Sequence, residues 1–395
     1  MSSSTRTWPD PARRLDDIEP FRVMAVLERA RAMQAAGRDI VHMEVGEPDF
    51  ATPGPVVEAG IRALRDGHTH YTPALGLPAL REAIAGYYAE RHGVAVSPDR
   101  VAVTPGASGA LLLVMAALFN PGDEVLLADP GYPCNRHFAR LVEAKGALVP
   151  VGPATGFQLT AELVARHWGP NTRGVLVANP GNPTGTVIPA EELRAIHAAA
   201  RERGGWLMVD EIYHELIYGA DEPSAARLGD DVIVINSFSK YWLMTGWRLG
   251  WLLAPEALMP AIDRLAQNVF LSAPTVAQHA ALAALGPATR VILEGHKAEL
   301  RSRRDYLVPE LARLGFGLPV EPQGAFYVYA DIGRFASDGE GFAADLLDRA
   351  GVAITPGLDF GHYQAGRHVR FAYTTSEDRL REAVARMQAL LAGRQ

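Results

Sequence analysis

The chain has 395 residues and a formal net charge of −7 at pH 7, and its 48% of hydrophobic residues is typical of a globular protein. Its length predicts about two to three domains with substantial cores. No segment concentrates Lys and Arg on one face, so we expect no nucleic-acid partner. The single cysteine, Cys134, excludes an internal disulfide, and because no His/Cys cluster accompanies it we expect no metal.

Two features of the sequence bear on where the protein works. The longest apolar runs, such as 110–119, are shorter than the roughly 20 residues that cross a bilayer, which argues against a membrane protein. The N-terminal sequence MSSSTRTWPDPARRL has neither the apolar core nor the cleavage site of a secretory signal. We therefore expect a cytoplasmic protein without membrane contact.

The middle of the chain alternates short β-branched runs with longer helical patterns, which predicts βαβ units in a parallel sheet. The strands are expected at 101–104, 124–129, 173–179, 206–210 and 232–236. Between two of them, a helix is expected to open at Pro189 and to stop at Gly204 and Gly205. Its apolar face comprises Leu193, Ile196, His197 and Ala200.

The C-terminal part of the chain has a different pattern. Strands are expected at 326–331 and 368–373, with a helix near 341–350 between them. A last helix opens after Ser376, and its apolar face comprises Leu380, Val384, Met387 and Leu391. These elements indicate an α+β unit rather than a continuation of the parallel sheet.

The element order predicts an α/β fold of two domains. Residues 55–290 are expected to form a large cofactor-binding domain, whose mostly parallel sheet is sandwiched by helices. Residues 291–395 are expected to form a smaller α+β domain. An N-terminal arm, residues 1–54, is expected to contribute to that smaller domain, which is therefore built from both chain ends.

The stretch VAVTPGASGALLLVMAALF, 101–119, predicts an anion site. A strand ends at Thr104, a glycine-bearing turn follows, and a long apolar helix is expected to begin near Ser108. Unpaired amides and the helix dipole favour a phosphate beside Ala107 and Ser108, although a chain that merely turns has the same pattern. The stretch lacks the Gly-Lys-Ser/Thr of a Walker motif and the Gly-x-Ser-x-Gly of a hydrolase.

The run INSFSKYWLMTGWRLGW, 235–251, places Ser237, Ser239, Lys240 and Arg248 close together. A lysine is usually solvated at the surface, but the aromatic and aliphatic neighbours of Lys240 indicate a desolvated site. Desolvation lowers the pKa of a lysine, which makes the amine available as a nucleophile and proton carrier. Ser237 and Lys240 also satisfy the Ser-x-x-Lys motif of penicillin-binding proteins, but no Lys-Thr-Gly follows.

Two further motifs follow predicted strands: NPGNPTG at 179–185 and DEIYHEL at 210–216. In a parallel sheet, ligands bind at the carboxyl ends of the strands. Asp210 ends an apolar strand, so its carboxylate needs a partner, and a protonated pyridine nitrogen is such a partner. Asn182 and Tyr213 could donate hydrogen bonds to a phenolate on the same ring. The His-Glu pair of the second motif lacks the second histidine of a zinc site.

These motifs and others along the chain stand in the order found in one enzyme family. They are VGEPDF at 45–50, YTPALGLPALREAIA at 71–85, TPGASGA, DPGY, NPGNPTG, DEIY, SFSK, TGWRLGW, PQGAFYVY, PGLDFG and VRFAYTTSE. In this set the chain resembles the fold-type-I, class I/II aminotransferases, the aspartate aminotransferase-like family, along nearly its whole length. The resemblance implies an aminotransferase that depends on pyridoxal 5′-phosphate and forms a homodimer.

The resemblance implies a role for each residue that the motifs single out. Lys240 is expected to hold the cofactor as a Schiff base, and Asp210 to pair with its pyridine nitrogen. Asn182 and Tyr213 are expected to hold the phenolic oxygen. Lys240, Asp210 and Tyr213 thus form the expected catalytic set, and the freed Lys240 would move a proton from the substrate's α-carbon to the cofactor.

The remaining implied roles concern the phosphate, the ring and the substrate. The phosphate is expected to be met by Ala107, Ser108, Ser237, Ser239 and Arg248. Tyr71 is expected to reach the phosphate from the other subunit, and Tyr132 to stack on the ring. The substrate's carboxylate is expected to meet Gly46 and Arg370, the latter through a two-pronged charge-assisted bond, with Asn182 beside them.

The expected reaction moves an amino group from an L-amino acid to a 2-oxo acid with ping-pong kinetics. In a dicarboxylate-specific subgroup, a lysine occupies the position of Ser108, so its absence here favours a neutral donor. A C–S lyase of the same fold would share these motifs and stays open as an alternative. A transcription regulator with an aminotransferase-like domain would need a DNA-binding region, but the residues before VGEPDF hold no basic helix-turn-helix.

Overall fold

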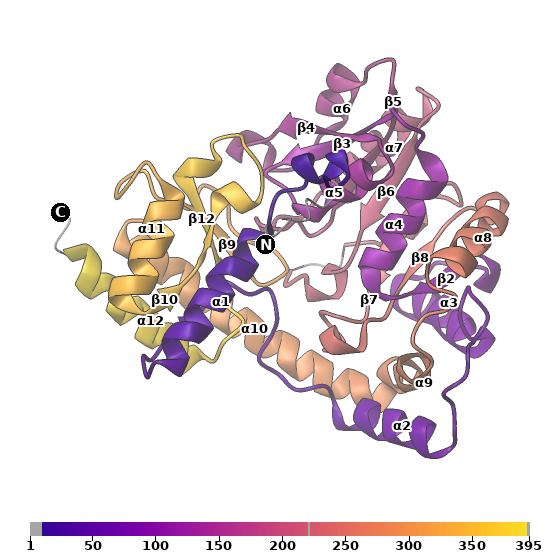
Figure 1. Ribbon diagram of the computed structural model, residues 1–395, viewed down its shortest axis with the longest axis horizontal. Coiled ribbons are helices and arrows are strands. Elements are labelled where there is room, and N and C mark those ends of the chain that lie inside the picture. Colours follow the sequence, from indigo (N-terminus) through magenta and orange to yellow (C-terminus); the bar gives the residue numbers. More distant parts are fainter. Residues whose placement is uncertain (1–9, 220–221, 393–395) are drawn as a thin grey trace, which may run out of the picture.

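The computed structural model describes residues 10–219 and 222–392, so the first nine residues of the N-terminal sequence lie outside it. Figure 1 shows a large sheet with helices on both of its sides and a smaller group of elements beside it. The smaller group contains α1 (Arg22–Ala35) and α12 (Glu377–Leu391), which come from opposite ends of the chain. The predicted α/β class is confirmed.

The large sheet has seven strands within the described residues, in the order β2-β8-β7-β6-β5-β3-β4. They are β2 (Val101–Thr104), β3 (Glu124–Asp129), β4 (Lys145–Pro150), β5 (Thr172–Ala178), β6 (Trp206–Asp210), β7 (Ile233–Ser237) and β8 (Gly250–Leu253). Strands β4, β3, β5, β6 and β7 pair in parallel, whereas β8 pairs antiparallel with both β2 and β7. The sheet is therefore mostly parallel, as the sequence predicted.

The predicted strands of this sheet are confirmed to within one residue at each end. Two strands were not predicted. Strand β4, with the sequence KGALVP, forms the sheet edge and is half exposed, and its Gly and Pro are residues that strands disfavour. Strand β8, with the sequence GWLL, has only four residues and directly follows a turn.

Both faces of the large sheet are buried. Met208 of β6 faces a layer formed by α4 (Gly106–Leu118), α5 (Cys134–Leu141) and α8 (Met259–Val269). Leu207 and Val209 face the other layer, which includes α6 (Ala161–His167) and α7 (Ala190–Arg201). Burial on both faces explains the continuous apolar runs of these strands. The predicted helix after Pro189 is confirmed as α7, and Gly204 with φ +68° stands in the turn that ends it.

Four further helices surround this sheet or lead away from it. They are α2 (Gly54–Arg65), α3 (Pro78–His92), α9 (Thr275–Ala284) and α10 (Pro287–Leu314). Helix α2 packs against α9, and α10 runs from there along the lower side of Figure 1 to the smaller group of elements. No helix within residues 10–219 and 222–392 is long and apolar enough to cross a membrane.

The smaller group contains an antiparallel sheet in the order β11-β12-β9. Its strands are β11 (Thr355–Pro356), β12 (His368–Ala372) and β9 (Tyr327–Asp331), and the last two confirm the predicted ones. Helix α11 (Gly339–Asp345) begins slightly earlier than predicted and ends in a π-helical turn, Leu346–Ala350. Helix α12 follows Ser376, whose hydroxyl accepts a hydrogen bond from the backbone of Arg379, as expected for an N-cap.

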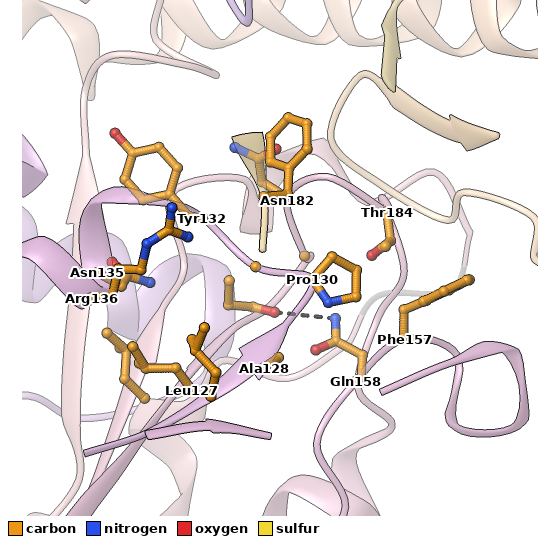
Figure 2. A pocket seen from close by; sticks show the side chains of 16 residues that line it. Leu127, Ala128, Pro130, Tyr132, Asn135, Arg136, Phe157, Gln158, Asn182 and Thr184 are labelled. Atoms are coloured by element: carbon orange, nitrogen blue, oxygen red, sulfur yellow. Dashed lines mark hydrogen bonds between the residues drawn. The ribbon is translucent and has the colours of Figure 1, made fainter. Parts of the chain in front are cut away.

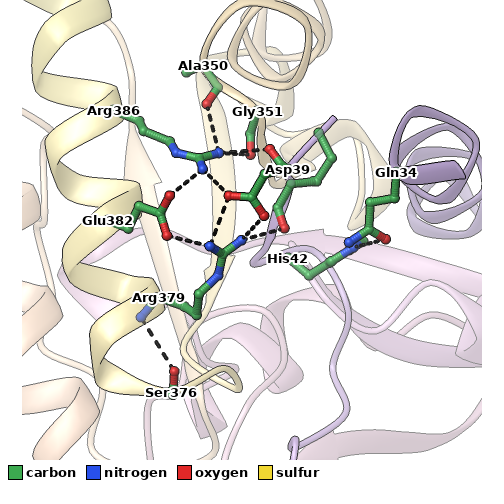
Figure 3. A network of polar contacts seen from close by, with 10 residues as sticks. Gln34, Asp39, His42, Ala350, Gly351, Ser376, Arg379, Glu382 and Arg386 are labelled. Carbon is green, nitrogen blue, oxygen red and sulfur yellow. Dashed lines mark hydrogen bonds and ion pairs between the residues drawn. The ribbon is translucent and has the colours of Figure 1, made fainter. Parts of the chain in front are cut away.

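The N-terminal segment joins the C-terminal elements. Strand β1 (Val41–His42) pairs in parallel with β10 (Val352–Ala353). Figure 3 shows Asp39 between two arginines of α12: Arg379 donates to its carboxylate at 2.7 Å, and Arg386 donates to its backbone carbonyl at 2.9 Å. The hydrogen bond from Arg379 is the main cause that lowers the pKa of Asp39 to about 2. These contacts support the expected contribution of residues 1–54 to the smaller domain, whose boundaries stay a prediction.

Candidate active site

A cavity of about 290 Å³ lies at the edge of the large sheet where its parallel strands end. Its lining contains the predicted residues Gly46, Ala107, Ser108, Tyr132, Asn182, Asp210, Tyr213, Ser237, Ser239, Lys240, Arg248 and Arg370. Residues separated by more than 300 positions in the sequence are thus brought together. Tyr71 lies outside this cavity, and its side chain is 81% exposed.

Lys240 lines this cavity and is partly buried. Its Nζ donates a hydrogen bond to the carbonyl of Gly46 at 2.7 Å. Burial lowers the pKa of Lys240 to about 8, and the nearby Glu47 carboxylate opposes this shift. A lysine with this pKa is about one-tenth neutral at pH 7, far more than an ordinary lysine, so its amine can attack a carbonyl or accept a proton.

Asp210 ends strand β6 with a buried carboxyl group. Burial raises its pKa to about 6, and one hydrogen bond, from the backbone amide of Ile212 at 3.1 Å, opposes the shift. That bond is the only one that the side chain makes within the described residues. A buried carboxylate with so little support favours a cationic partner in the cavity.

The start of α4 and the loop after β7 form a cradle for an anion. Helix α4 begins at Gly106, two residues earlier than predicted, and Gly106 has a φ of +72°, which glycine adopts without the strain of a side chain. A Cβ at Gly106 would lie 2.5 Å from Nη2 of Arg248. The hydroxyls of Ser237 and Ser239 lie 2.9 Å apart, and Arg248 contacts Ser239 at 3.5 Å. Hydroxyls, a guanidinium and helix N-terminal amides therefore converge, as a phosphate group requires.

Arg370 also lines the cavity. Its guanidinium carbon lies 4.2 Å from the ring centre of Tyr327 and 4.8 Å from that of Phe360. Its Nη1 donates to Oδ1 of Asn182 at 3.0 Å, and its Nε is buried without a partner in the described structure. Arg370 is thus held in one position and retains a donor for a carboxylate.

Tyr327 contacts the predicted residues but had no predicted role. Its hydroxyl lies 2.8 Å from that of Tyr213, and burial raises the pKa of Tyr213 well above its usual value. A Cβ at Gly46 would overlap the Tyr327 hydroxyl, which explains why glycine stands there. Only the motif PQGAFYVY pointed to Tyr327, because a tyrosine in an apolar strand usually packs in a core.

Sequence reasoning also missed the side of the cavity formed by the beginning of α1. Phe21, Val23 and Met24 line it, as does Glu47, which accepts a hydrogen bond from the hydroxyl of Thr245. No charge or glycine pattern marks this part of α1, so the sequence carries no signal for it. The N-terminal arm thus contributes directly to the site.

A second, much smaller cavity lies behind Tyr132 and Asn182, with a volume of about 30 Å³. Figure 2 shows Arg136 extending towards Tyr132, and Gln158 below them donating to the carbonyl of Ala178 at 3.3 Å. The volume is far too small for a substrate.

The geometry of the site bears on two alternatives that the sequence raised, an acylating enzyme with a Ser-x-x-Lys motif and a metal site. The hydroxyl of Ser237 lies 2.9 Å from that of Ser239 and 3.1 Å from the carbonyl oxygen of Leu249, and Lys240 contacts Gly46, so Ser237 and Lys240 do not form the hydrogen-bonded pair of an acylating enzyme. Within the part of the chain that the structure describes, no group of three or more His, Cys, Asp or Glu side chains is placed to hold a metal ion.

Comparison with known proteins gives a consistent result. Residues 38–387 match the family "Aminotransferase class I and II". The valine–pyruvate aminotransferase of Mycobacterium tuberculosis is 42% identical over 376 residues, which cover 95% of this chain and 97% of the relative. The aspartate/prephenate aminotransferase of Thermus thermophilus is 37% identical, with 96% of this chain and 98% of the relative covered.

Solved structures show the same similarity. The crystal structure of an aminotransferase from Mycobacterium tuberculosis has a TM-score of 0.94 and 41% identity, with 98% of this chain and all of that chain covered. The aspartate aminotransferase of Thermus thermophilus with maleate has a TM-score of 0.92 and 37% identity, with 97% and 100% covered. Both similarities extend over the whole fold.

The cofactor of this family fits the cavity. The cradle at Gly106 and Arg248 suits a phosphate, the weakly supported carboxyl of Asp210 suits a protonated ring nitrogen, and the buried amine of Lys240 suits an aldehyde. The lyase alternative gains no support, since the relatives named above are aminotransferases. The chain belongs to the class I and II aminotransferase family, and it is a pyridoxal-phosphate-dependent enzyme that transfers an amino group to a 2-oxo acid.

Proposed function

We propose that this enzyme takes its amino group from a neutral L-amino acid and works as a homodimer in the cytoplasm, with Lys240 as the catalytic base. The observation that carries the proposal is the buried Lys240 amine, which shares one cavity with Asp210, with the anion cradle and with Arg370. The reaction needs these four functions, and no other cavity lining described here combines them.

The residues of the cavity divide into groups that hold the cofactor and groups that act on the substrate. Pyridoxal phosphate, when bound, supplies an aldehyde for the amino group and a ring that accepts negative charge. Its phosphate would be held by Ala107, Ser108, Ser237, Ser239 and Arg248, and Tyr132 would cover the ring. Asp210 would face the ring nitrogen, and Tyr213 with the amide of Asn182 would donate to the phenolic oxygen. Lys240 would bind the aldehyde carbon as a Schiff base.

Lys240 would also have a second task, as a carrier of protons. The neutral Nζ accepts the proton of the substrate's α-carbon and later returns a proton, so the amine acts as base and then as acid. Burial supports this role, because a pKa near 8 leaves the amine able to do both near neutral pH. The carbonyl of Gly46, 2.7 Å from Nζ, orients the amine.

The charges of the cavity support a neutral donor. Lys240, Arg248 and Arg370 are the only Lys or Arg side chains that line it in the described structure, and each already has a task. Arg370 would receive the α-carboxylate, which leaves no cation for a second carboxylate on the donor. The relative from Mycobacterium tuberculosis is named a valine–pyruvate aminotransferase, and one from Pseudomonas aeruginosa is named an arginine–pyruvate transaminase. The relative from Thermus thermophilus is named for aspartate and prephenate.

The surface around Tyr71 supports the dimer. Tyr71 is 81% exposed, and Leu64 and Leu271 are 57% and 53% exposed. The loop that holds Tyr71 contacts the start of α9, where Thr275 donates to the carbonyl of His70 at 2.7 Å. Exposed apolar side chains favour a second copy of the chain as their cover, and the exposed Tyr71 would then reach the cofactor of that copy.

The experiment that tests the function measures kcat/KM for alanine, leucine, phenylalanine, glutamate and aspartate. Each donor is tested with pyruvate and with 2-oxoglutarate, except where donor and acceptor are the same pair. We expect transamination with a lead for the neutral donors. A clear lead for aspartate would contradict the neutral-donor proposal. Release of pyruvate and ammonia from a cysteine conjugate without any transamination would contradict the aminotransferase reaction itself.

A further inference from the structure

The first turn of α1 has an unusual cap. Its N-cap residue, Phe21, has no side-chain oxygen, so it cannot accept a hydrogen bond from the free amides at the helix start. The cap comes instead from Asp359, which lies more than 300 residues later in the chain. One oxygen of Asp359 accepts from the amide of Arg22 at 2.8 Å, and the other from the amide of Val23 at 3.4 Å.

The capped turn forms one wall of the active-site cavity. Phe21, Val23 and Met24 all line the cavity, and they are apolar. The ring of Phe21 meets that of Tyr132 edge-on, with 6.3 Å between the ring centres. The wall therefore stands beside the residue expected to cover the cofactor, where a donor's side chain would lie.

Asp359 is itself held in a fixed loop. The carbonyl of the next residue, Phe360, accepts from the amide of Gly131 at 2.8 Å, and the ring of Phe360 packs against the guanidinium of Arg370. A few residues on, the carboxylate of Asp129 accepts from the amides of His362 and Tyr363 at 3.0 and 3.1 Å. The loop that caps α1 thus also contacts the arginine that would bind the substrate's carboxylate.

Other contacts of this part of the chain are weaker. Arg22 pairs with Glu340 at 2.8 Å, and Glu19 pairs with Arg136 at 2.8 Å, but in each pair at least one side chain is more than a third exposed. Exposed pairs contribute little and are screened by salt. The carboxylate of Asp359 is buried, with 3% exposure, and meets the positive end of the helix dipole directly.

We propose that Asp359 is a positioning residue for donor specificity, because it fixes the first turn of α1 so that Phe21, Val23 and Met24 contact the donor's side chain. The substrate class that fits this wall is an amino acid with a branched or aromatic apolar side chain. Alanine, whose side chain is a single methyl group, does not reach the wall. This inference rests on the proposed neutral-donor function and names the element that selects the side chain.

The test compares leucine with alanine in the first half-reaction of the holoenzyme, which needs no acceptor. We expect Asp359→Ala to lower the second-order rate constant for leucine about tenfold more than the one for alanine. Loss of an apolar contact in a substrate pocket has effects of this order. Phe21→Ala is expected to lower the ratio of the leucine rate constant to the alanine rate constant as well. Asp359→Asn, which keeps one acceptor oxygen without the charge, is expected to lie between the parent and Asp359→Ala.

A binding measurement gives a readout that does not depend on turnover. Calorimetry on the holoenzyme compares 4-methylpentanoate, which has the carbon skeleton of leucine, with propanoate, which has that of alanine. Asp359→Ala is expected to weaken 4-methylpentanoate about tenfold and to leave propanoate nearly unchanged. Ser376→Ala is the control, because it removes the cap of α12, which lies away from the cavity. It should lower Tm without changing the leucine-to-alanine ratio of rate constants or the ratio of the two acid affinities.

The proposal would be overturned if Asp359→Ala lowered the rate constants for leucine and alanine equally, or if it left the relative affinity for the two carboxylic acids unchanged. If Asp359→Ala does not fold, the ratios in Asp359→Asn and Phe21→Ala decide the question in the same way. A parent enzyme that transaminates no amino acid would contradict the proposed function. In that case the relative affinity for the two carboxylic acids can still be compared between the parent and Phe21→Ala. This comparison tests whether the first turn of α1 contacts the ligand's side chain.

Discussion

The side chain of Lys240 is desolvated and lines the same cavity as Asp210 and Arg370, and the reaction should depend on it. Lys240→Ala is expected to lose at least about 100-fold in turnover, because positioned proton transfer contributes this much or more. The purified parent should be yellow, and the variant should lose the absorbance of covalently held cofactor. Lys145→Ala, which removes an exposed lysine paired with Glu124, serves as control. Full activity of Lys240→Ala would disprove the assignment.

Asp210 links the site to the pH dependence of stability. Burial raises its pKa from 3.8 to about 6, so the folded apoenzyme binds this proton more tightly than the unfolded chain does. Stability from this group is therefore present below about pH 4 and is lost as pH rises to about 6, with a limit of about 3 kcal/mol. In Asp210→Asn this loss of stability with rising pH is absent, because an amide does not ionise.

The measurement is the Tm of the apoenzyme against pH for the parent and for Asp210→Asn. The two values should be close near pH 4, and the variant should become the more stable protein by pH 7. The cofactor should reverse this order, because its ring nitrogen gives the Asp210 carboxylate a cationic partner. A Tm difference that does not change with pH would mean that Asp210 is not the buried acid described here.

At the level of elements, the start of α4 forms part of the proposed phosphate site. Gly106→Ala would place a Cβ 2.5 Å from the guanidinium of Arg248 and would strain a backbone with φ +72°. We expect pyridoxal phosphate to bind at least about tenfold more weakly, which corresponds to one charge-assisted hydrogen bond. Pyridoxal without phosphate should bind the parent and the variant alike. Gly86→Ala in α3, where a Cβ meets nothing within 4 Å, is the control.

The elements also show how far the sequence alone leads. Strands such as β6 were predictable because burial on both faces leaves a continuous apolar run that ends in a charged residue, Asp210. Strand β4 was not, since an edge strand needs no such run. The cavity wall at Phe21 was not predictable either, because its cap, Asp359, comes from another part of the chain and leaves no local pattern. The motif residues were found in order, but only the fold shows which of them meet.

At the scale of the whole molecule, the expected dimer makes each site depend on two chains. Tyr71→Ala should retain cofactor poorly, and Lys240→Ala should be inactive, yet a mixture of the two should regain activity. In a hybrid dimer one site would carry both changes and the other neither, so random reassembly should restore up to about a quarter of the parent rate. Sedimentation would confirm the dimer. No recovery in confirmed hybrids would place Tyr71 in the site of its own chain.

The pairing of β1 with β10 has a consequence for how the enzyme is made. Residues 39–42 leave the ribosome well before their partners in β10 and α12, which lie more than 300 residues later in the chain. The large sheet, with Asp210, Lys240 and the phosphate cradle, is complete before Arg370 and Asp359 exist. A nascent chain is therefore expected to hold cofactor before it can select a substrate, and discrimination between amino acids would be acquired later, when these distant segments meet.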